Sequence, residues 1–293
     1  MRPRDGAGRS LGTVPTSAPR TAFVLGGGGM LGAAEVGMLG ALVEAGIRPD
    51  LVVGSSVGAI NGAVLAADPT IEQVEALGAV WRGIAANDTF GGSLLGRLAT
   101  LARSRTHIHS PDPLRRQLSE RLPATFDELA VPFQCVAASV ERAAAHWFDA
   151  GALVPAILAS CAVPGLLPPV SIDGEHHFDG GLVHSIPLGR AIELGAQCIY
   201  VLQVGRIEAP LQRPRWPWEV ALVAFEISRR HSFVEDMARV PDGVTVHVLP
   251  TGRADPLSYN DPSQLRYRDT TNVAARIERA YWATAEYLSR LEG

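Results

Sequence analysis

Ser56 lies at the centre of the stretch GSSVG (54–58), which fits the pattern G-x-S-x-G. The apolar run DLVVG leads into this stretch, and the uncharged run VGAINGAVLAA (57–67) follows the serine. The two runs predict a buried strand and a buried helix, so the serine falls on the turn between them. Such a turn needs small neighbours, here Gly54 and Gly58. It also presents the serine hydroxyl at a helix N-terminus, where developing negative charge is favoured. The chemistry that this pattern indicates is nucleophilic attack by a serine.

A second candidate is the glycine-rich stretch GGGGMLG (26–32), which follows the predicted strand TAFVLG. Gly27, Gly29 and Gly32 match G-x-G-x-x-G, a pattern that binds dinucleotide phosphates. A dinucleotide site also needs an acidic residue at the end of the second strand, to hold the ribose. That position holds Gly-Ser-Ser (54–56) instead, so the acidic residue that a dinucleotide site requires is missing.

The other interpretation joins the two motifs. Their strands are consecutive in one predicted β-α-β unit, so we expect the two loops to be neighbours in space. The backbone N–H groups of Gly27, Gly28 and Gly29 would then point at a carbonyl oxygen held above Ser56. That arrangement is an oxyanion hole, in which one lost donor costs about 3 kcal/mol of transition-state stabilisation.

The base that would activate the serine is predicted to be Asp179, in the stretch FDGGL. Gly180 and Gly181 after it allow a tight turn and a close approach by substrate. The alternative for Asp179 is a purely structural Asx-turn. Asp173 is a second Asp-Gly pair, but it suits the tip of a predicted β-hairpin. The chain has eight histidines, none of which stands in an evident triad context.

The composition of the chain excludes several other classes of protein. The chain has 293 residues, 47% of them hydrophobic, and a net charge of −4, which argues against a nucleic-acid surface. Its three cysteines lie in apolar runs without a C-x-x-C pair, so we expect free thiols, no structural zinc site and a reducing compartment. No apolar run approaches the roughly 18 residues of a membrane span, and no secretory signal is present. The expectation is a cytoplasmic protein that needs no cofactor or metal ion.

The order of apolar strands and helices predicts an α/β fold, namely a three-layer α/β/α architecture with a mostly parallel central sheet. Residues 1–20 are rich in Arg, Gly, Pro and Ser and are predicted to be a disordered tail. Residues 21–205 would form the catalytic domain. Residues 206–293 would add helices and a strand that pack on the same domain.

Three motifs in this order, GGGGMLG, GSSVG and FDGG, resemble those of the patatin-like phospholipases, and within them the bacterial proteins related to neuropathy target esterase. The resemblance covers residues 21–205 and implies a lipid acyl hydrolase with a Ser-Asp dyad rather than a triad. It places Ser56 as nucleophile and Asp179 as base. The oxyanion hole and the supporting turns fall on Gly27, Gly28, Gly29, Gly32, Gly54, Gly58, Gly180 and Gly181.

One position departs from the family pattern, which usually has Arg or Lys where this chain has Leu31. The departure motivates an alternative function, a catalytically weak lipid-binding or regulatory relative.

A further expectation concerns the connector RPRWPWEVALVAF (213–225), in which Trp216 and Trp218 lie among arginines. Indole rings and arginines favour the headgroup level of a membrane, so this segment is predicted to touch the membrane surface or to gate the acyl site. The alternative is that the tryptophans anchor the core.

Overall fold

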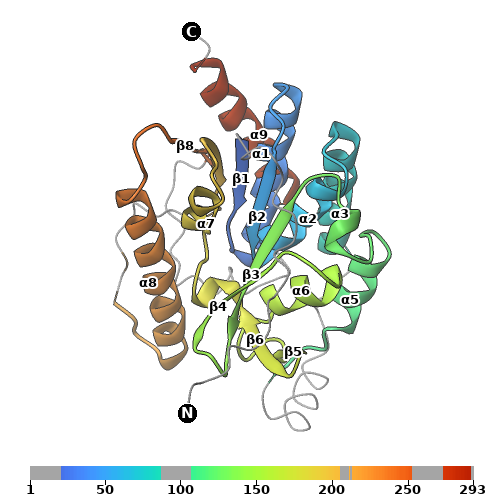
Figure 1. Cartoon of the computed structure of the whole chain (residues 1–293), viewed down its shortest axis with the longest axis vertical. Helices are drawn as coiled ribbons and strands as arrows, with labels where there is room; N and C mark the ends of the chain where they lie inside the picture. The colour runs from blue at the N-terminus through green and yellow to red at the C-terminus, as the bar shows by residue number, and fades with distance from the viewer. Residues whose placement is uncertain (1–20, 87–106, 205–210, 212, 253–272, 292–293) are drawn as a thin grey trace, which may run out of the picture.

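A computed structural model gives the fold of the chain (Figure 1). It describes residues 21–86, 107–204, 211, 213–252 and 273–291. The predicted disordered tail, residues 1–20, lies outside the described residues. The boundary predicted between residues 205 and 206 also falls outside them and stays a prediction.

The described strands form one mixed sheet of eight strands, in the order β5-β6-β3-β2-β1-β7-β8, with β4 paired on β3. The pairs β3–β2, β2–β1, β1–β7 and β7–β8 are parallel, whereas β4 and β6 run antiparallel to β3 and β5 runs antiparallel to β6. The strands are β1 (Thr21–Leu25), β2 (Leu51–Ser55), β3 (Phe133–Ser139), β4 (Ala144–Phe148), β5 (Val170–Ile172), β6 (Glu175–Asp179), β7 (Cys198–Leu202) and β8 (Thr245–Val248).

Helices cover both faces of this sheet, and Figure 1 shows α8 on the opposite side of the strands from α2, α3 and α5. The helices are α1 (Ala33–Glu44), α2 (Val57–Ala67), α3 (Ile71–Ala86), α5 (Asp112–Ser119), α6 (Leu153–Ser160), α7 (Leu188–Glu193), α8 (Pro217–Ala238) and α9 (Val273–Ser289). Short 3₁₀ turns span Gly29–Gly32, Phe126–Glu128 and Gly180–Leu182.

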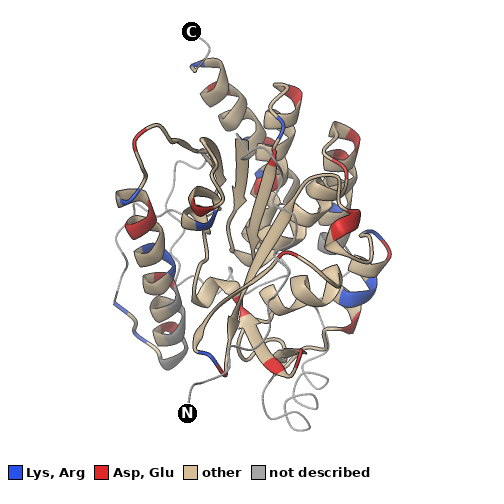
Figure 2. Ribbon diagram, in the orientation of Figure 1, with Lys and Arg blue, Asp and Glu red and all other residues tan. Residues whose placement is uncertain are grey.

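Two hydrophobic cores follow from the alternation of side chains along the strands. Phe23 and Leu25 point to the face that packs against α1, α2, α3, α5, α6 and α9. Ala22 and Val24 point to the face that packs against α7 and Phe233 of α8. Strands β1, β2, β3 and β7 carry no charged residue (Figure 2), as expected for strands buried on both faces. The predicted three-layer α/β/α fold is confirmed.

The pairing of β3 explains how distant motifs meet. Strand β2 runs beside the first half of β3, ending with Ser55 opposite Val136. Strand β6 runs beside the second half, ending with Asp179 opposite Ala137. Strand β4 pairs with residues 135–139 of β3, a stretch that includes residues paired with β2 and residues paired with β6. Because each edge of β3 can pair with only one strand at a given residue, β4 occupies one edge and β2 and β6 share the other. The ends of β2 and β6 therefore meet head to head, which places Ser56 next to Asp179.

The predicted hairpin is present between β5 and β6. Asp173 and Gly174 have φ angles of 51° and 82° at the tip between β5 and β6, as a type I′ turn requires. Strand β8 extends the sheet beside β7, and α9 packs against α1. A Cβ at Gly37 of α1 would lie 2.0 Å from the Ile277 carbonyl oxygen, so this glycine permits the close approach of α9. Among the described helices, none combines the length and the apolar character needed to cross a membrane.

Candidate active site

Ser56 sits on a strained turn between β2 and α2. Its φ and ψ are 53° and −124°, a left-handed conformation that residues other than glycine rarely adopt. A Cβ at position 54 would lie 2.5 Å from the Gly58 carbonyl oxygen, and a Cβ at position 58 would lie 2.4 Å from the Leu25 carbonyl oxygen. The two glycines of G-x-S-x-G are therefore needed for the turn to close, and the serine projects at the N-terminus of α2.

Helix α6 holds the backbone of this turn from the other side. The Ser56 N–H donates to Ser160 Oγ at 2.9 Å, and the Cys161 thiol donates to the Ser56 carbonyl oxygen at 3.2 Å. Burial raises the pKa of Cys161 well above its usual value, so this group stays a protonated donor. Sequence reasoning assigned neither residue to the site. Both residues fall in the stretch LASCAVPG (158–165), which contains none of the three motifs.

The Ser56 hydroxyl donates directly to Asp179, with 2.7 Å between Oγ and Oδ2. Asp179 is buried, and its other oxygen, Oδ1, accepts the Gly181 N–H at 2.7 Å. A Cβ on Gly180 would lie 2.2 Å from the Val136 carbonyl oxygen. Only glycine therefore fits at this position, where β6 ends. The carboxylate is thus fixed at both oxygens and points one of them at the serine.

Burial also sets the acidity of this carboxyl group. Loss of hydration raises the pKa of Asp179 to about 6, against the lowering effect of the hydrogen bonds from Ser56 and Gly181. An aspartate with an ordinary pKa near 4 is a weak base. A carboxylate with a raised pKa accepts a proton more readily and is still ionised at neutral pH.

The structure departs from the sequence interpretation at Gly27. Its N–H donates to the Ser185 carbonyl oxygen at 2.8 Å, so this amide already has a hydrogen-bond acceptor within the protein. The glycine still has a steric role, because a Cβ there would lie 3.3 Å from Ser56 Cβ and 3.1 Å from Ser185 Oγ. The amides of Gly28 and Gly29 donate to no residue in the described part of the chain, so they remain candidate oxyanion donors.

The rest of the glycine loop is packed closely against its neighbours. A Cβ on Gly28 would lie 2.1 Å from Val204 Cγ2, and a Cβ on Gly32 would lie 2.5 Å from Val57 Cγ2. Gly29 has a φ of 55° and begins the 3₁₀ turn. Because Gly32 has no side chain, the loop packs directly against Val57, the first residue of α2. The two loops are thus neighbours, as the sequence predicts for one β-α-β unit.

A buried polar network supports this loop from the inside. Asn61 of α2 donates through Nδ2 to the Gly32 carbonyl oxygen at 3.1 Å and to Glu35 Oε2 at 2.7 Å. Its carbonyl oxygen accepts the Trp81 indole N–H at 3.0 Å. Burial raises the pKa of Glu35 well above its usual value, which favours the neutral acid. The network connects α1, α2 and α3 to the glycine loop.

Two arginines from the C-terminal part of the chain reach the same loop. Arg229 of α8 is buried, and its Nε donates to Ser185 Oγ at 3.1 Å, beside the carbonyl that holds Gly27. Arg276 of α9 donates through Nη1 to the Met30 carbonyl oxygen at 2.7 Å. Leu31 itself is half-buried and packs against the core. The loop therefore has cations nearby, although its own sequence has none.

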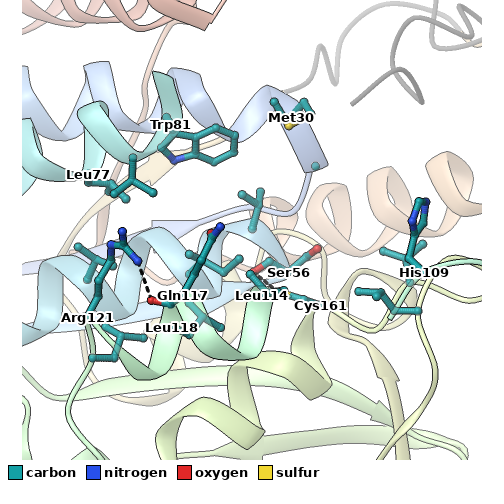
Figure 3. A pocket seen from close by; sticks show the side chains of 18 of the residues that line it. Met30, Ser56, Leu77, Trp81, His109, Leu114, Gln117, Leu118, Arg121 and Cys161 are labelled. Atoms are coloured by element: carbon teal, nitrogen blue, oxygen red, sulfur yellow. Dashed lines mark hydrogen bonds between the residues drawn. The ribbon is translucent and has the colours of Figure 1, made fainter. Parts of the chain in front are cut away.

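Ser56 opens onto an apolar cavity of about 290 Å³ (Figure 3). The cavity runs between α2, α3, α5 and the segment after α6. In Figure 3, Ser56 and Cys161 lie at one part of its wall and Arg121 lies toward the end away from His109. Its apolar lining includes Ile60, Leu77, Trp81, Leu114, Leu118 and Leu166. No sequence motif indicated this cavity, because its wall comes from segments that meet only in the fold.

The rival bases considered from sequence lie elsewhere. Asp173 is at the hairpin tip, and His176 is exposed and donates from Nδ1 to the Glu141 carboxylate at 2.7 Å. His109 lines the cavity, but the Ser56 hydroxyl hydrogen is directed at Asp179. The geometry thus brings together Ser56, Asp179 and the glycine loop.

The fold and the site define an α/β protein with a serine on a strand-to-helix turn, paired directly with a buried aspartate. The family model described as "Patatin-like phospholipase" matches residues 23–192, more than half of the chain. The chain therefore belongs to the patatin-like phospholipase family.

Relatives of known name are consistent with this membership. A patatin-like phospholipase domain-containing protein of Caenorhabditis elegans is 34% identical over 64% of this chain and 14% of its own length. Lysophospholipase nte1 of Emericella nidulans is 28% identical over 64% of this chain and 12% of its own. An uncharacterized NTE family protein of Mycobacterium tuberculosis is 30% identical over 69% of this chain and 54% of its own.

Among solved structures, VipD from Legionella pneumophila has a TM-score of 0.43 at 14% identity, covering 94% of this chain and 67% of its own. The chain spans a minor part of the first two relatives and about half of the mycobacterial one.

Proposed function

We propose that this protein is a serine acyl hydrolase that cleaves carboxylic esters of lipids, including phospholipids. The observation that carries the proposal is the 2.7 Å hydrogen bond from Ser56 Oγ to Asp179 Oδ2 at the wall of an apolar cavity. A serine in direct contact with a buried carboxylate is an activated nucleophile, and the cavity beside it provides room for a hydrocarbon chain.

In the first half of the reaction, Ser56 Oγ attacks the ester carbonyl carbon while its proton passes to Asp179. The carbonyl oxygen becomes an oxyanion, for which the N–H groups of Gly28 and Gly29 and the N-terminus of α2 provide stabilisation. Asp179 then returns the proton to the departing alcohol oxygen. The products of this half are an acyl-enzyme and the free alcohol or lysolipid.

In the second half, water attacks the acyl-enzyme. Asp179 accepts a proton from this water, the same oxyanion forms again, and its collapse releases the fatty acid and restores the Ser56 hydroxyl. The Gly181 amide keeps the Asp179 carboxylate in place throughout, because it binds the oxygen that does not face the serine.

The composition of the cavity supports a lipid acyl chain as the bound group. Most of the lining side chains are aliphatic or aromatic, and burial of each methylene is favourable by about 0.8 kcal/mol. The names of relatives agree with this class of substrate, since one is called a lysophospholipase and another a patatin-like phospholipase domain-containing protein. A lipid substrate would be met from the aqueous side, by transient contact with a membrane surface.

The test is hydrolysis of esters of graded acyl length by the wild-type protein and by Ser56→Ala, with labelling by a fluorophosphonate probe measured alongside. We expect hydrolysis that increases with acyl length, probe attachment at Ser56, and loss of both in Ser56→Ala. Equal hydrolysis by wild type and a folded Ser56→Ala protein would refute the proposal.

A second candidate is a lipid-binding relative with weak catalysis, which Leu31 and the occupied Gly27 amide favour. Under this candidate the cavity still binds a fatty acid, but Ser56 reacts with the probe no faster than an ordinary serine. Fatty-acid binding without probe labelling would select it over the hydrolase.

A further inference from the structure

A second cluster of side chains lies on the strand that carries Asp179. Glu175 and His177 belong to β6, and His146 belongs to β4, on the opposite edge of β3. Residues two apart on a strand point to the same face, and the pairing places His146 opposite Ala137 and His177 opposite Ser139. The three side chains therefore share one face of the sheet, and one ligand atom from each lies within 4.8 Å of the others.

His177 is the member of this cluster whose buried ring nitrogens lack hydrogen-bond partners in the described part of the chain. Its side chain is buried, yet neither ring nitrogen has a hydrogen-bond partner among the described residues. Buried polar atoms in native proteins nearly always have a partner, so each exception needs an explanation. The ring contacts Phe148 and His146 edge-on, and Nε2 lies 3.9 Å from Glu175 Oε2, beyond hydrogen-bonding distance.

Two imidazoles and one carboxylate form a donor set that suits zinc and its neighbours among the divalent transition metals. His146 Nδ1 and His177 Nε2 each lie 3.9 Å from Glu175 Oε2. Ligands of a tetrahedral zinc ion are separated by roughly 3.4 Å, given metal–ligand distances near 2.1 Å. Small rotations of the side chains would therefore close the site. Ser139 Oγ donates to Glu175 Oε2 at 3.1 Å and helps to orient the carboxylate.

Arg142 competes for the same position. Its Nη2 lies 2.6 Å from Glu175 Oε2 and contacts His146 Nδ1, so the guanidinium supplies the positive charge that the carboxylate needs. The Arg142 side chain is half exposed and can turn into solvent, whereas His177 is held in the core. His146 and Glu175 are partly exposed, which gives an ion a route from solvent.

We propose that His146, Glu175 and His177 bind a divalent transition-metal ion of the zinc type, in exchange for the Arg142 guanidinium. The bound ion ties the β3–β4 hairpin to β6, two residues before Asp179. No sequence motif indicates this site, because its ligands come from strands on opposite edges of β3 and no C-x-x-C pair is involved.

The test uses the full chain, freed of metal by a chelator and titrated with Zn²⁺ by calorimetry, with Mg²⁺ as the comparison ion. We expect one Zn²⁺ per chain, a higher melting temperature with Zn²⁺, and no response to Mg²⁺, which prefers oxygen ligands. Co²⁺ in place of Zn²⁺ should give the visible absorption of a four-coordinate site. Absence of saturable Zn²⁺ binding would overturn the proposal.

Matched variants locate the site. His177→Phe keeps an aromatic ring in the core and removes both nitrogens, and it should weaken Zn²⁺ binding by more than about 100-fold. His176→Ala, at the exposed neighbouring histidine, should leave binding unchanged. Equal losses in the two variants would overturn the assignment. If His177→Phe does not fold, the partly exposed Glu175→Gln provides the same test, and unchanged binding there would contradict the proposal.

Arg142→Gln tests the exchange between arginine and metal. Removing the guanidinium frees Glu175, so Zn²⁺ should bind several-fold more tightly than to the wild-type protein. A cluster that is only an ion pair would show no Zn²⁺ binding in either protein. Weaker binding in Arg142→Gln would show that the arginine does not compete.

Discussion

Gly27 donates its amide hydrogen to the carbonyl oxygen of Ser185 at 2.8 Å, which fixes the start of the glycine loop against the segment that follows Asp179. The Ser185 hydroxyl in turn accepts a hydrogen bond from the buried Arg229 of α8 at 3.1 Å. Arg229 is also paired with Glu226, one turn earlier on the helix. A cation outside the family motifs therefore positions the loop that lies above Ser56.

This relationship predicts the effect of Ser185→Ala. The variant removes the acceptor for Arg229 but keeps the carbonyl that holds Gly27, so the loop becomes less well positioned. We expect kcat for ester hydrolysis to fall about tenfold, or about 1.4 kcal/mol, with KM nearly unchanged. Ser228→Ala is the control, because its hydroxyl bonds the Leu182 carbonyl on the same side of α8. Equal kinetics in the two variants would argue against a positioning role for Ser185.

A second prediction concerns Leu31→Arg, which restores the cation usual in the family. The added charge lies beside the glycine loop, where it helps the oxyanion and attracts a phosphate group. We expect turnover of phospholipids to rise relative to that of neutral short-chain esters. Leu31→Met, which keeps the size and adds no charge, should leave the ratio unchanged. The prediction fails if Leu31→Arg changes both substrates equally or lowers both.

Much of the fold was predictable because its signals are local. The apolar runs around Ser56 and the Asp173-Gly174 turn have the boundaries that their sequences indicate, within one or two residues. The pairing of Ser56 with Asp179 was inferred from two local turn motifs and from the family resemblance. The register of β3 explains that pairing, but no local pattern reveals it.

Other parts of the site could not be predicted because they depend on contacts between distant segments. Ser160 and Cys161 hold the Ser56 backbone across more than 100 residues of sequence, and neither belongs to a turn motif. The partner of the Gly27 amide, which the sequence interpretation made an oxyanion donor, could not be predicted for the same reason. A glycine-rich loop shows that amides are accessible, but not which of them another segment, here Ser185, already uses.

The cavity predicts a change in acyl-chain preference. Ile60 lines the cavity one turn after Ser56 on α2. Ile60→Phe would shorten the space next to the nucleophile, so turnover of long-chain esters should fall about tenfold while that of short-chain esters changes little. Ala79→Phe adds the same ring on the exposed side of α3 and serves as the control. A uniform loss for all chain lengths in a folded Ile60→Phe protein would place the acyl chain elsewhere.

The outer side of α8 predicts contact with a membrane. Trp216, Val220, Ile227 and Val234 are 57%, 54%, 55% and 56% exposed, so Trp216 is not the core anchor that the alternative interpretation proposed. Val223 is buried, which removes it from the predicted contact surface, and the Trp218 side chain lies outside the described residues. Helix α8 carries both acidic and basic residues (Figure 2), so the apolar side chains are expected to provide most of the binding.

The measurement is co-sedimentation with anionic phospholipid vesicles. Trp216→Ala combined with Ile227→Ser should reduce vesicle binding about tenfold, because an indole ring and an aliphatic side chain no longer enter the headgroup region. Trp282→Ala is the matched control, since Trp282 is 64% exposed but belongs to α9. Unchanged vesicle binding by the folded α8 variant would contradict the prediction.

The Ser56–Asp179 pair is tested most directly by Asp179→Asn, a substitution that keeps the shape of the side chain and removes its capacity to accept the serine proton. The measurement is steady-state hydrolysis of a long-chain ester by wild type, Asp179→Asn and Ser56→Ala, with folding of each protein checked by thermal melting. The account predicts that both variants melt cooperatively and lose activity by about a thousandfold or more. A folded Asp179→Asn protein with near-normal turnover would contradict it and return the search for a base to the histidines.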